Sequence, residues 1–448
     1  MRRRLAIAVG VLLAGPAGAA TLQEAWDAAE RGSVEVRLAR EQVVQTGTLR
    51  FQALSVQLPQ VLTQWTWVRN EVEIPIPDEL LQPQYVFVTQ SGQFVPLPDD
   101  FVPPSDVDVD RSALPQLQPL ETFGGSVTLL QPLLRAQAVP GWQAATGAWR
   151  AAQREESRVR QAVRAATARV FFGLHTARAA VEVAQANVEV SRRQLDLARR
   201  QVDAGLVARR AVLQAELAVS RAERDRNGAA EQVVVAEQGW RRVVGSDPPA
   251  DLDLPAPFEL PDEALPEDAL ARRDDLEAAE LRVTAARKER TARDLEWAPT
   301  VDFFFQENLN LTPSALSPRV DQWRLGLRLD WTIFDGGLRI ARSRELRSRV
   351  RAAELLVEQR QRMVREEVAV GVERVQRAER TLEAVEREVD LATESLELAE
   401  RAFEAGSATF LDVESARLAL SSALLARISE RAERELAAVD LLLAMGVL

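Results

Sequence analysis

The sequence predicts a mainly α-helical protein with a small β part, in which long helical hairpins are combined with four short strands. Three observations predict this class: an internal repeat, sustained heptad patterns, and four segments in which polar and apolar residues strictly alternate. Sustained heptads indicate long packed helices, and alternation with a period of two indicates strands with one apolar face.

The first residues have the pattern of a secretory signal peptide. Three arginines, Arg2 to Arg4, precede the apolar run Leu5–Leu13, and small residues follow at positions 17–20. The run is too short to cross a bilayer as a helix, and this order of basic, apolar and small residues is typical of a cleaved export signal. We therefore expect residues 1–20 to be a signal peptide and the mature chain to be exported.

The composition argues against several classes of function. The chain has no cysteine, which excludes disulfides, thiolate metal sites and a lipid anchor on cysteine. A net charge of −11 argues against a broad nucleic-acid surface. The single histidine, His175, lies in a helical pattern, and no glycine-rich phosphate loop occurs between a strand and a helix. We expect no catalytic residue, no cofactor and no metal site, so the protein is not expected to be an enzyme.

Two halves of the chain follow one plan. The segment Leu195–Gly205 matches Leu396–Gly406, 201 residues later (406 − 205). Pro59 and Pro299, which precede alternating segments, are 240 residues apart, so the first half holds 39 extra residues (240 − 201). The segment from 71 to 121, rich in Pro, Asp and Gln, is the expected place for this excess and reads as a long loop. We expect a first repeat at 21–260 and a second at 261–448.

Each half is expected to end in a long helical hairpin. In the first half, a seam of small and medium residues steps by three and four: Val181, Ala184, Val188, Ser191, Leu195, Ala198 and Val202. The same seam recurs 201 residues later, from Leu382 to Phe403. A helix from about Gln143 to Ala204 would be about 90 Å long. Gly205 and Gly406 interrupt the seams and are the expected hairpin tips.

The four alternating segments predict strands. They centre on Trp65 and Trp67, Val127 and Leu129, Phe303 and Phe305, and the run from Trp323 to Ile333. In the fourth, an apolar face with tryptophan near both ends opposes arginines and an aspartate, which is typical of a membrane barrel strand. The expected lipid-facing residues are Trp65, Trp67, Trp323, Leu325, Leu327, Leu329 and Trp331. The alternative is an amphipathic sheet that packs on a soluble core.

Four strands indicate that the chain oligomerises if it enters a membrane. After the signal peptide there is no apolar run of 18 or more residues, so a spanning helix is not expected. Four strands are too few to close a β-barrel, and an open sheet edge cannot lie in lipid. Three chains would supply twelve strands.

Together these features resemble the TolC-like outer-membrane efflux family. The resemblance is carried by Leu325–Gly337, in which a strand runs into Ile-Phe-Asp-Gly-Gly before a long helix, with Thr332 where the family usually has proline. Gln131–Leu134 resembles the first-half counterpart, and Ala269–Ala279 resembles the opening of the second repeat. The order and spacing of these segments cover essentially the whole mature chain.

The resemblance implies a fold, partners and a function. It implies a homotrimer in the outer membrane, with an α-barrel tunnel in the periplasm and a shared 12-stranded β-barrel in outer-membrane lipid. It implies a passive exit channel of a tripartite efflux or type I secretion system, fed by an inner-membrane pump and a periplasmic adaptor. The expected adaptor contacts are the tips Gly205, Leu206, Val207, Gly406, Ser407, Ala408 and Thr409. The alternative is a periplasmic coiled-coil scaffold without a pore, which would not need the apolar face of the fourth strand.

The resemblance also implies a pore constriction at Asp412. Acidic residues just past the second tip line the narrowest point in the family, and a ring of carboxylates attracts cations. The alternative is an ordinary aspartate in the first turn of a helix, where the helix dipole favours it. The chain departs from the family at Ser415, where some members carry a second acidic residue. The first-half equivalent of Asp412 is Ala211, which follows Arg209 and Arg210.

Overall fold

A computed structural model describes residues 19–77, 87–88, 94–95, 116–205, 208–261, 264–312, 314, 321–405 and 407–448. The signal peptide expected at 1–20 lies almost entirely outside the described residues. Most of the expected loop at 71–121 lies outside them as well, and so do the tip residues Leu206, Val207 and Gly406. The order helix, strand, strand, long helix, second helix occurs twice along the described chain.

The chain forms two compact units, each built from both halves of the sequence. The strand unit comprises residues 50–143 and 288–346, and the helical unit comprises the residues up to 49 together with 144–287 and 347–448. The two long helices that follow the strand hairpins each begin in the strand unit and continue into the helical unit.

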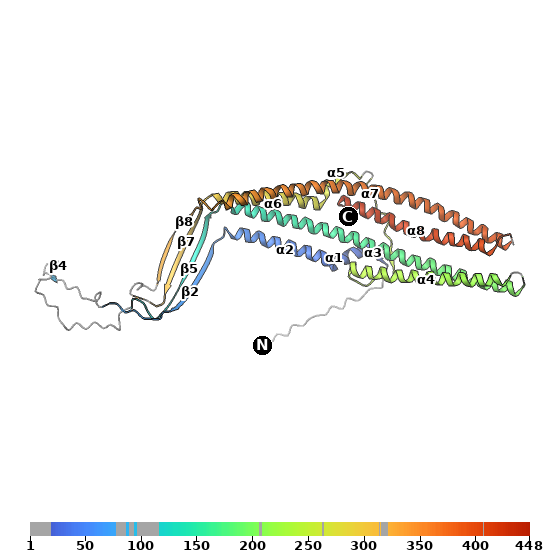
Figure 1. Ribbon diagram of the computed structural model, residues 1–448, viewed down its shortest axis with the longest axis horizontal. Helices are drawn as coiled ribbons and strands as arrows, with labels where there is room; N and C mark the ends of the chain where they lie inside the picture. Colours follow the sequence, from blue (N-terminus) through green and yellow to red (C-terminus); the bar gives the residue numbers. More distant parts are fainter. Residues whose placement is uncertain are drawn as a thin grey trace. The chain divides into compact units, whose positions relative to one another are not determined.

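The strand unit contains one antiparallel sheet of four strands in the order β2-β5-β7-β8 (Figure 1). Its members are β2 (Gln60–Arg69), β5 (Glu121–Leu134), β7 (Thr300–Asn310) and β8 (Asp321–Asp330). Two minor ladders are separate from this sheet: β1 (Ala20–Thr21) pairs with β6 (Leu252–Asp253) in the helical unit, and β3 (Phe87–Val88) pairs with β4 (Phe94–Val95) in the strand unit. β2 and β8 are the edge strands, because each pairs with one strand only within the described chain.

The fourth strand is shorter than its sequence pattern predicts. β8 ends at Asp330, so Trp331 and Ile333 lie in the turn that follows and not in the strand. Hydrogen bonds hold this turn: the Trp331 indole donates to the carbonyl of Trp297 at 3.1 Å, and the Arg339 guanidinium donates to the carbonyl of Thr332 at 2.5 Å. These contacts engage the side chain of Trp331 and the backbone of Thr332. The alternation of side chains therefore continues past the point where strand pairing stops.

Two helical hairpins account for most of the helical unit (Figure 1). α3 (Ala138–Asp203) turns into α4 (Arg209–Val244), and α7 (Leu338–Glu404) turns into α8 (Phe410–Met445). α3 and α7 have 66 and 67 residues, which at 1.5 Å per residue makes each about 100 Å long. α3 begins upstream of the expected Gln143 because Pro140 lies in the first turn, where its missing N–H is not needed.

Shorter helices complete the fold: α1 (Leu22–Gly32), α2 (Val34–Ser55), α5 (Pro266–Arg272), α6 (Asp274–Asp294) and the 3₁₀ helix η3 (Leu295–Trp297). Within the helical unit, the main apolar cluster joins α1, α2, α3, α4 and α8 around Phe171 and Trp240. The predicted seam is buried where the hairpin helices meet, at Val188, Ala198 and Val389. Among the described helices, none combines the length and the apolar character that crossing a bilayer requires.

Candidate channel wall and docking tips

The register of the sheet places the expected lipid-facing residues of β2 and β8 on one face. Trp65 pairs with Gly125, and Phe305 pairs with Leu325, so the apolar members of all four strands point to the same side. Two aromatic pairs lie on this face, Trp65 with Phe123 at 5.8 Å and Phe305 with Trp323 at 6.5 Å between ring centroids. The face is exposed in the single chain, and large exposed apolar surfaces mark contact with a membrane or another chain.

The opposite face of the sheet is polar and hollowed. A hollow of about 730 Å³ lies here. Its lining combines the polar side chains of Gln64, Ser126, Thr128, Gln306, Arg324 and Arg328 with the apolar side chains of Leu62, Leu130, Phe304, Leu327 and Leu329. The Arg324 guanidinium donates two hydrogen bonds to the side-chain oxygen of Gln306, at 2.9 and 2.6 Å. Because Gln306 is neutral, these two hydrogen bonds do not offset the positive charge that Arg324 places on the polar face.

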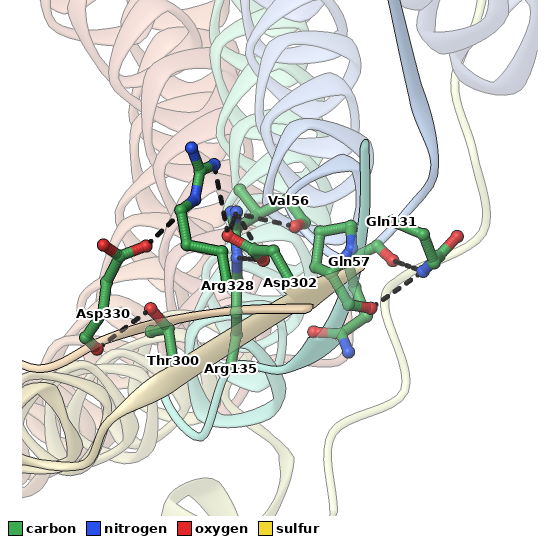
Figure 2. A network of polar contacts seen from close by, with 9 residues as sticks. Val56, Gln57, Gln131, Arg135, Thr300, Asp302, Arg328 and Asp330 are labelled. Atoms are coloured by element: carbon green, nitrogen blue, oxygen red, sulfur yellow. Dashed lines mark hydrogen bonds and ion pairs between the residues drawn. The ribbon is translucent and has the colours of Figure 1, made fainter. Parts of the chain in front are cut away.

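A polar network joins the strand ends nearest the helices (Figure 2). The Arg135 guanidinium donates to Asp302 Oδ1 at 3.1 and 3.3 Å and to the carbonyl of Val56 at 3.3 Å. Arg328 lies 4.0 Å from the same carboxylate and 3.3 Å from that of Asp330. Asp302 is buried, and a buried carboxylate is stable only with such partners. The network therefore ties the ends of β5, β7 and β8 to the residues that follow α2.

The Asp-Gly-Gly turn between β8 and α7 is organised by Arg339. Asp335 accepts hydrogen bonds from the backbone N–H of Gly337 at 3.1 Å and from the backbone and side chain of Arg339 at 3.0 and 2.9 Å. Gly336 and Gly337 have φ of 70° and 89°, a conformation that other residues adopt only with strain. The Arg339 guanidinium stacks on Trp297 at 4.0 Å. The sequence singled out the turn but not Arg339 or Trp297, which are 42 positions apart (339 − 297).

The first hairpin tip owes its turn to Gly205. Its φ is 71°, its N–H donates to the carbonyl of Val202 at 2.9 Å, and a Cβ built there would meet nothing within 4 Å. The glycine is therefore needed for its backbone conformation and not for space. α4 starts after Ala208, which makes no side-chain capping hydrogen bond.

The second tip is closed by hydrogen bonds to one carbonyl. The backbone N–H groups of Ser407 and Ala408 donate to the carbonyl of Ala402 at 2.9 and 3.2 Å, and the Ser407 hydroxyl donates to it at 3.0 Å. Ser407 and Thr409 are exposed, whereas Ala408 is half-buried. Gly406 itself lies outside the described residues, as do Leu206 and Val207 of the first tip.

Asp412 is exposed and takes part in the start of α8. Its carboxylate accepts hydrogen bonds from the backbone N–H and the hydroxyl of Thr409, each at 2.7 Å, and the Thr409 hydroxyl accepts from the Asp412 N–H at 3.4 Å. This is a capping box, which satisfies two N–H groups at the helix start. The hydrogen bonds from Thr409 hold the pKa of Asp412 below its ordinary value. The carboxylate thus has a local role, and a pore constriction at this residue stays a prediction.

The segment that opens the second repeat holds a buried ion cluster in the helical unit. Arg273 donates to both oxygens of Asp275 at 2.8 Å, to Glu367 at 2.6 Å and to the carbonyl of Ala444 at 3.0 Å. Burial by itself would raise the pKa of Asp275, but the hydrogen bonds and charge of Arg273 hold it below its ordinary value. The cluster joins the α5–α6 junction to α7 and to the end of α8, so its role is structural.

The described residues contain no group of three or more His, Cys, Asp or Glu side chains that could hold a metal ion. His175 lines a cavity of about 410 Å³ in the helical unit with Phe172 and Ile428, and burial lowers its pKa. Glu435, an acidic residue that also lines this cavity, accepts a hydrogen bond from the N–H of Phe258 at 3.2 Å.

Comparison with known proteins gives consistent likenesses. The family model described as outer membrane efflux protein matches residues 108–246 and 265–447, more than two thirds of the chain. The structure of CusC is similar over 95% of this chain and 92% of that one, with a TM-score of 0.75 and 14% identity.

Two further channels are similar over 95% of this chain. The MtrE outer membrane channel of Neisseria gonorrhoeae has a TM-score of 0.74 at 18% identity, with 88% of that chain covered. The CmeC outer membrane channel of Campylobacter jejuni has a TM-score of 0.74 at 13% identity, with 85% covered. At these identities the likenesses establish the fold. No curated protein sequence matches significantly.

Proposed function

The chain belongs to the outer membrane efflux protein family, and it is therefore an outer-membrane protein; from that premise we propose that it is the passive exit channel of a tripartite efflux or type I secretion system. In this role it receives solutes from an inner-membrane pump through a periplasmic adaptor and releases them outside the cell. The observation that carries the proposal is the four-stranded sheet, with one exposed apolar face, one hollowed polar face and two open edges.

The open edges support closure of the sheet by further copies of the chain. Neighbouring strands alternate in direction from β2 to β8, so β8 of one copy would run antiparallel to β2 of the next. Three copies would give a closed barrel of twelve strands without an unpaired edge, which lipid requires. Its apolar face, with Trp67 and Leu327, would meet lipid, and Arg324 and Arg328 would face the lumen.

The long helices support a tunnel that is also built from several copies. α8 exposes Leu411, Leu418 and Leu425 at steps of seven, and α7 exposes Leu391 and Leu398 at the same step. Heptad-spaced leucines are normally buried against another helix. Their exposure in the single chain supports packing of the α7–α8 hairpin against helices of a neighbouring copy.

Purification and conductance measurements test the proposal. The protein extracted from outer membranes should be a trimer in detergent and should produce discrete conductance steps in planar lipid bilayers. The trimer is expected because three copies of the four-stranded sheet would close a twelve-stranded barrel with no unpaired edge. A periplasmic scaffold without a pore would instead appear in the soluble periplasmic fraction and would produce no conductance steps in the bilayers. That result would refute the channel proposal.

A further inference from the structure

The two hairpin tips carry opposite net charges at repeat-related positions. We define tip 1 as residues 199–205 and 208–216, and tip 2 as residues 400–405 and 407–417, which lie 201 residues later (400 − 199). In sequence, tip 1 has four arginines and two acidic residues, a net charge of +2, and tip 2 has two arginines and four acidic residues, a net charge of −2. The repeat has therefore kept the backbone plan and inverted the charge.

One ion pair shows the inversion directly. In tip 1 Arg199 of α3 lies 3.1 Å from Glu216 of α4. At the equivalent positions of tip 2, Glu400 of α7 lies 3.6 Å from Arg417 of α8, so the carboxylate and the guanidinium have changed places. The Arg199 side chain is 53% exposed and that of Glu400 51%, whereas that of Arg417 is only 8% exposed. Tip 1 thus exposes its bridging cation, and tip 2 buries its cation and exposes the carboxylate.

The first turns of α4 and α8 extend the contrast. Arg209 and Arg210 are exposed in the first turn of α4, and no hydrogen bond or ion pair joins either of them to another described residue. The start of a helix is its positive end and favours acidic residues, so two arginines there do not serve the stability of α4. The equivalent residues of α8 are Phe410 and Leu411, followed by the carboxylate of Asp412. An anionic group outside the chain would offset this unfavourable placement in α4.

We infer that the tips are a docking surface of alternating charge, on which the partner presents acidic side chains to tip 1 and basic side chains to tip 2. The inference rests on the proposed function, because it takes the partner to be a periplasmic adaptor that meets both tips. Complementary charge speeds and orients association, and like charges brought together suppress wrong pairings. An adaptor displaced by one tip around the ring would meet like charges at each contact, so the alternation fixes its register.

The opposite potentials can be measured without the partner. The chain has no cysteine, so Ala208→Cys and Ser407→Cys each give one exposed thiol, beside tip 1 arginines and tip 2 acids respectively. The rate of modification by an anionic methanethiosulfonate relative to a cationic one should be roughly fivefold higher at position 208 than at 407, and the difference should shrink in high salt. Equal ratios at the two positions would overturn the inference.

The chemistry of the partner is tested by photo-crosslinking in cells. A benzophenone side chain at position 208 should capture acidic peptides of a periplasmic protein, and one at 407 should capture basic peptides of the same protein. Arg209→Glu with Arg210→Glu should lower the yield at 208 several-fold. The matched control, Arg221→Glu with Arg224→Glu on exposed positions of the same helix about 18 Å away, should leave it unchanged.

The possible outcomes separate this inference from the channel proposal. Partner peptides of the same charge at both positions, or an unchanged yield in the tip 1 variant, contradict the charge assignment while the channel proposal stands. Crosslinks to the chain itself would assign the charges to contacts between copies and so overturn the docking assignment. A protein that neither conducts nor crosslinks at either tip contradicts the proposed function as well.

Discussion

At the scale of single residues, Asp412 has an observed role in the fold and a predicted role in the pore. In the chain it caps α8 together with Thr409, and three copies in a trimer would place three such carboxylates around one axis. The two roles need different properties of the residue: the cap needs an acceptor oxygen, whereas a cation filter needs the negative charge. Substitutions can therefore separate them.

Asp412→Asn keeps an acceptor oxygen and removes the charge. If Asp412 forms the constriction, the variant should conduct with weaker cation selectivity and lose its block by di- and trivalent cations in planar bilayers, because bound cations relieve the repulsion between neighbouring carboxylates. Thr409→Ala is the control, since it removes the capping partner and leaves the charge. Unchanged selectivity in Asp412→Asn would place the constriction elsewhere.

Gly125 lies directly opposite Trp65 in the sheet, and the Trp65 indole lies over Gly125 because the glycine has no side chain. A Cβ built at Gly125 would lie 2.5 Å from the Trp65 ring, so Gly125→Ala should displace the ring and cost about 1–3 kcal/mol. The thermal midpoint of β-structure loss in detergent should fall. Gly141→Ala is the control, because a Cβ there meets nothing within 4 Å, and Trp65→Leu should restore the midpoint. A midpoint as low in Gly141→Ala would mean that the loss has another cause.

At the scale of elements, local periodicity predicted which segments are strands and helices but not where they stop. The alternation from Trp323 to Ile333 is unbroken in the sequence, yet β8 ends at Asp330 because contacts from Arg339 and Trp297 hold the turn. The partner of Trp65 was also beyond prediction, since the register between two strands depends on their pairing and not on either pattern.

The two faces of β8 should respond differently to charge. Leu327→Lys places a cation on the apolar face, at a cost of about 2–4 kcal/mol if the position lies near the middle of the bilayer. Arg324→Lys, three residues away on the polar face, keeps a cation where one already lies. The yield of folded protein in the outer-membrane fraction should fall in the first variant and not in the second. Equal yields would show that this face of the sheet does not meet lipid.

The Arg273 cluster should govern how α5 and α6 attach to α7 and α8. Arg273→Met leaves the buried carboxylate of Asp275 without its main partner, which should destabilise the protein by about 3–5 kcal/mol. Adding Asp275→Leu should recover part of that loss, because it removes the buried carboxylate that has lost its main partner. Denaturant unfolding followed by helical circular dichroism measures both variants. A double variant no more stable than Arg273→Met would contradict the ion-pair explanation.

At the scale of the whole molecule, most of the architecture could be predicted from the sequence because the chain contains an internal repeat. The heptad seams and their 201-residue offset predicted two helical hairpins, and these are present as α3–α4 and α7–α8. The sequence did not predict which helices pack beside each hairpin. α3 lies beside α8: the Asn187 side chain donates a hydrogen bond to the Ser421 hydroxyl at 2.6 Å, and Arg169 donates one to Asp440 at 2.5 Å. In both contacts the two residues are more than 230 positions apart. No local period encodes such a contact.

Orientation in the membrane is the property on which the proposed function depends most. β2 begins shortly after the end of α2, and β5 ends shortly before the start of α3. Because β2 and β5 are antiparallel, the segment that connects them starts at the opposite end of these two strands. The bridge between Ile74 and Gln118 and the hydrogen bond from Asn70 to the carbonyl of Leu120 prolong that hairpin beyond Arg69. If the tips meet a periplasmic adaptor, we predict that the segment from 71 to 121 is extracellular.

Cysteine labelling of whole cells tests this orientation in a chain that has no native cysteine. A PEG-maleimide too large to pass porins should label Glu73→Cys in intact cells, and should label Ala208→Cys only after the outer membrane is permeabilised. Protease added to intact cells should likewise cut first between residues 71 and 121. Labelling in the reverse order would place the tips outside the cell, where they could not meet a periplasmic adaptor, and the exit-channel proposal would fail even if the protein conducts ions in bilayers.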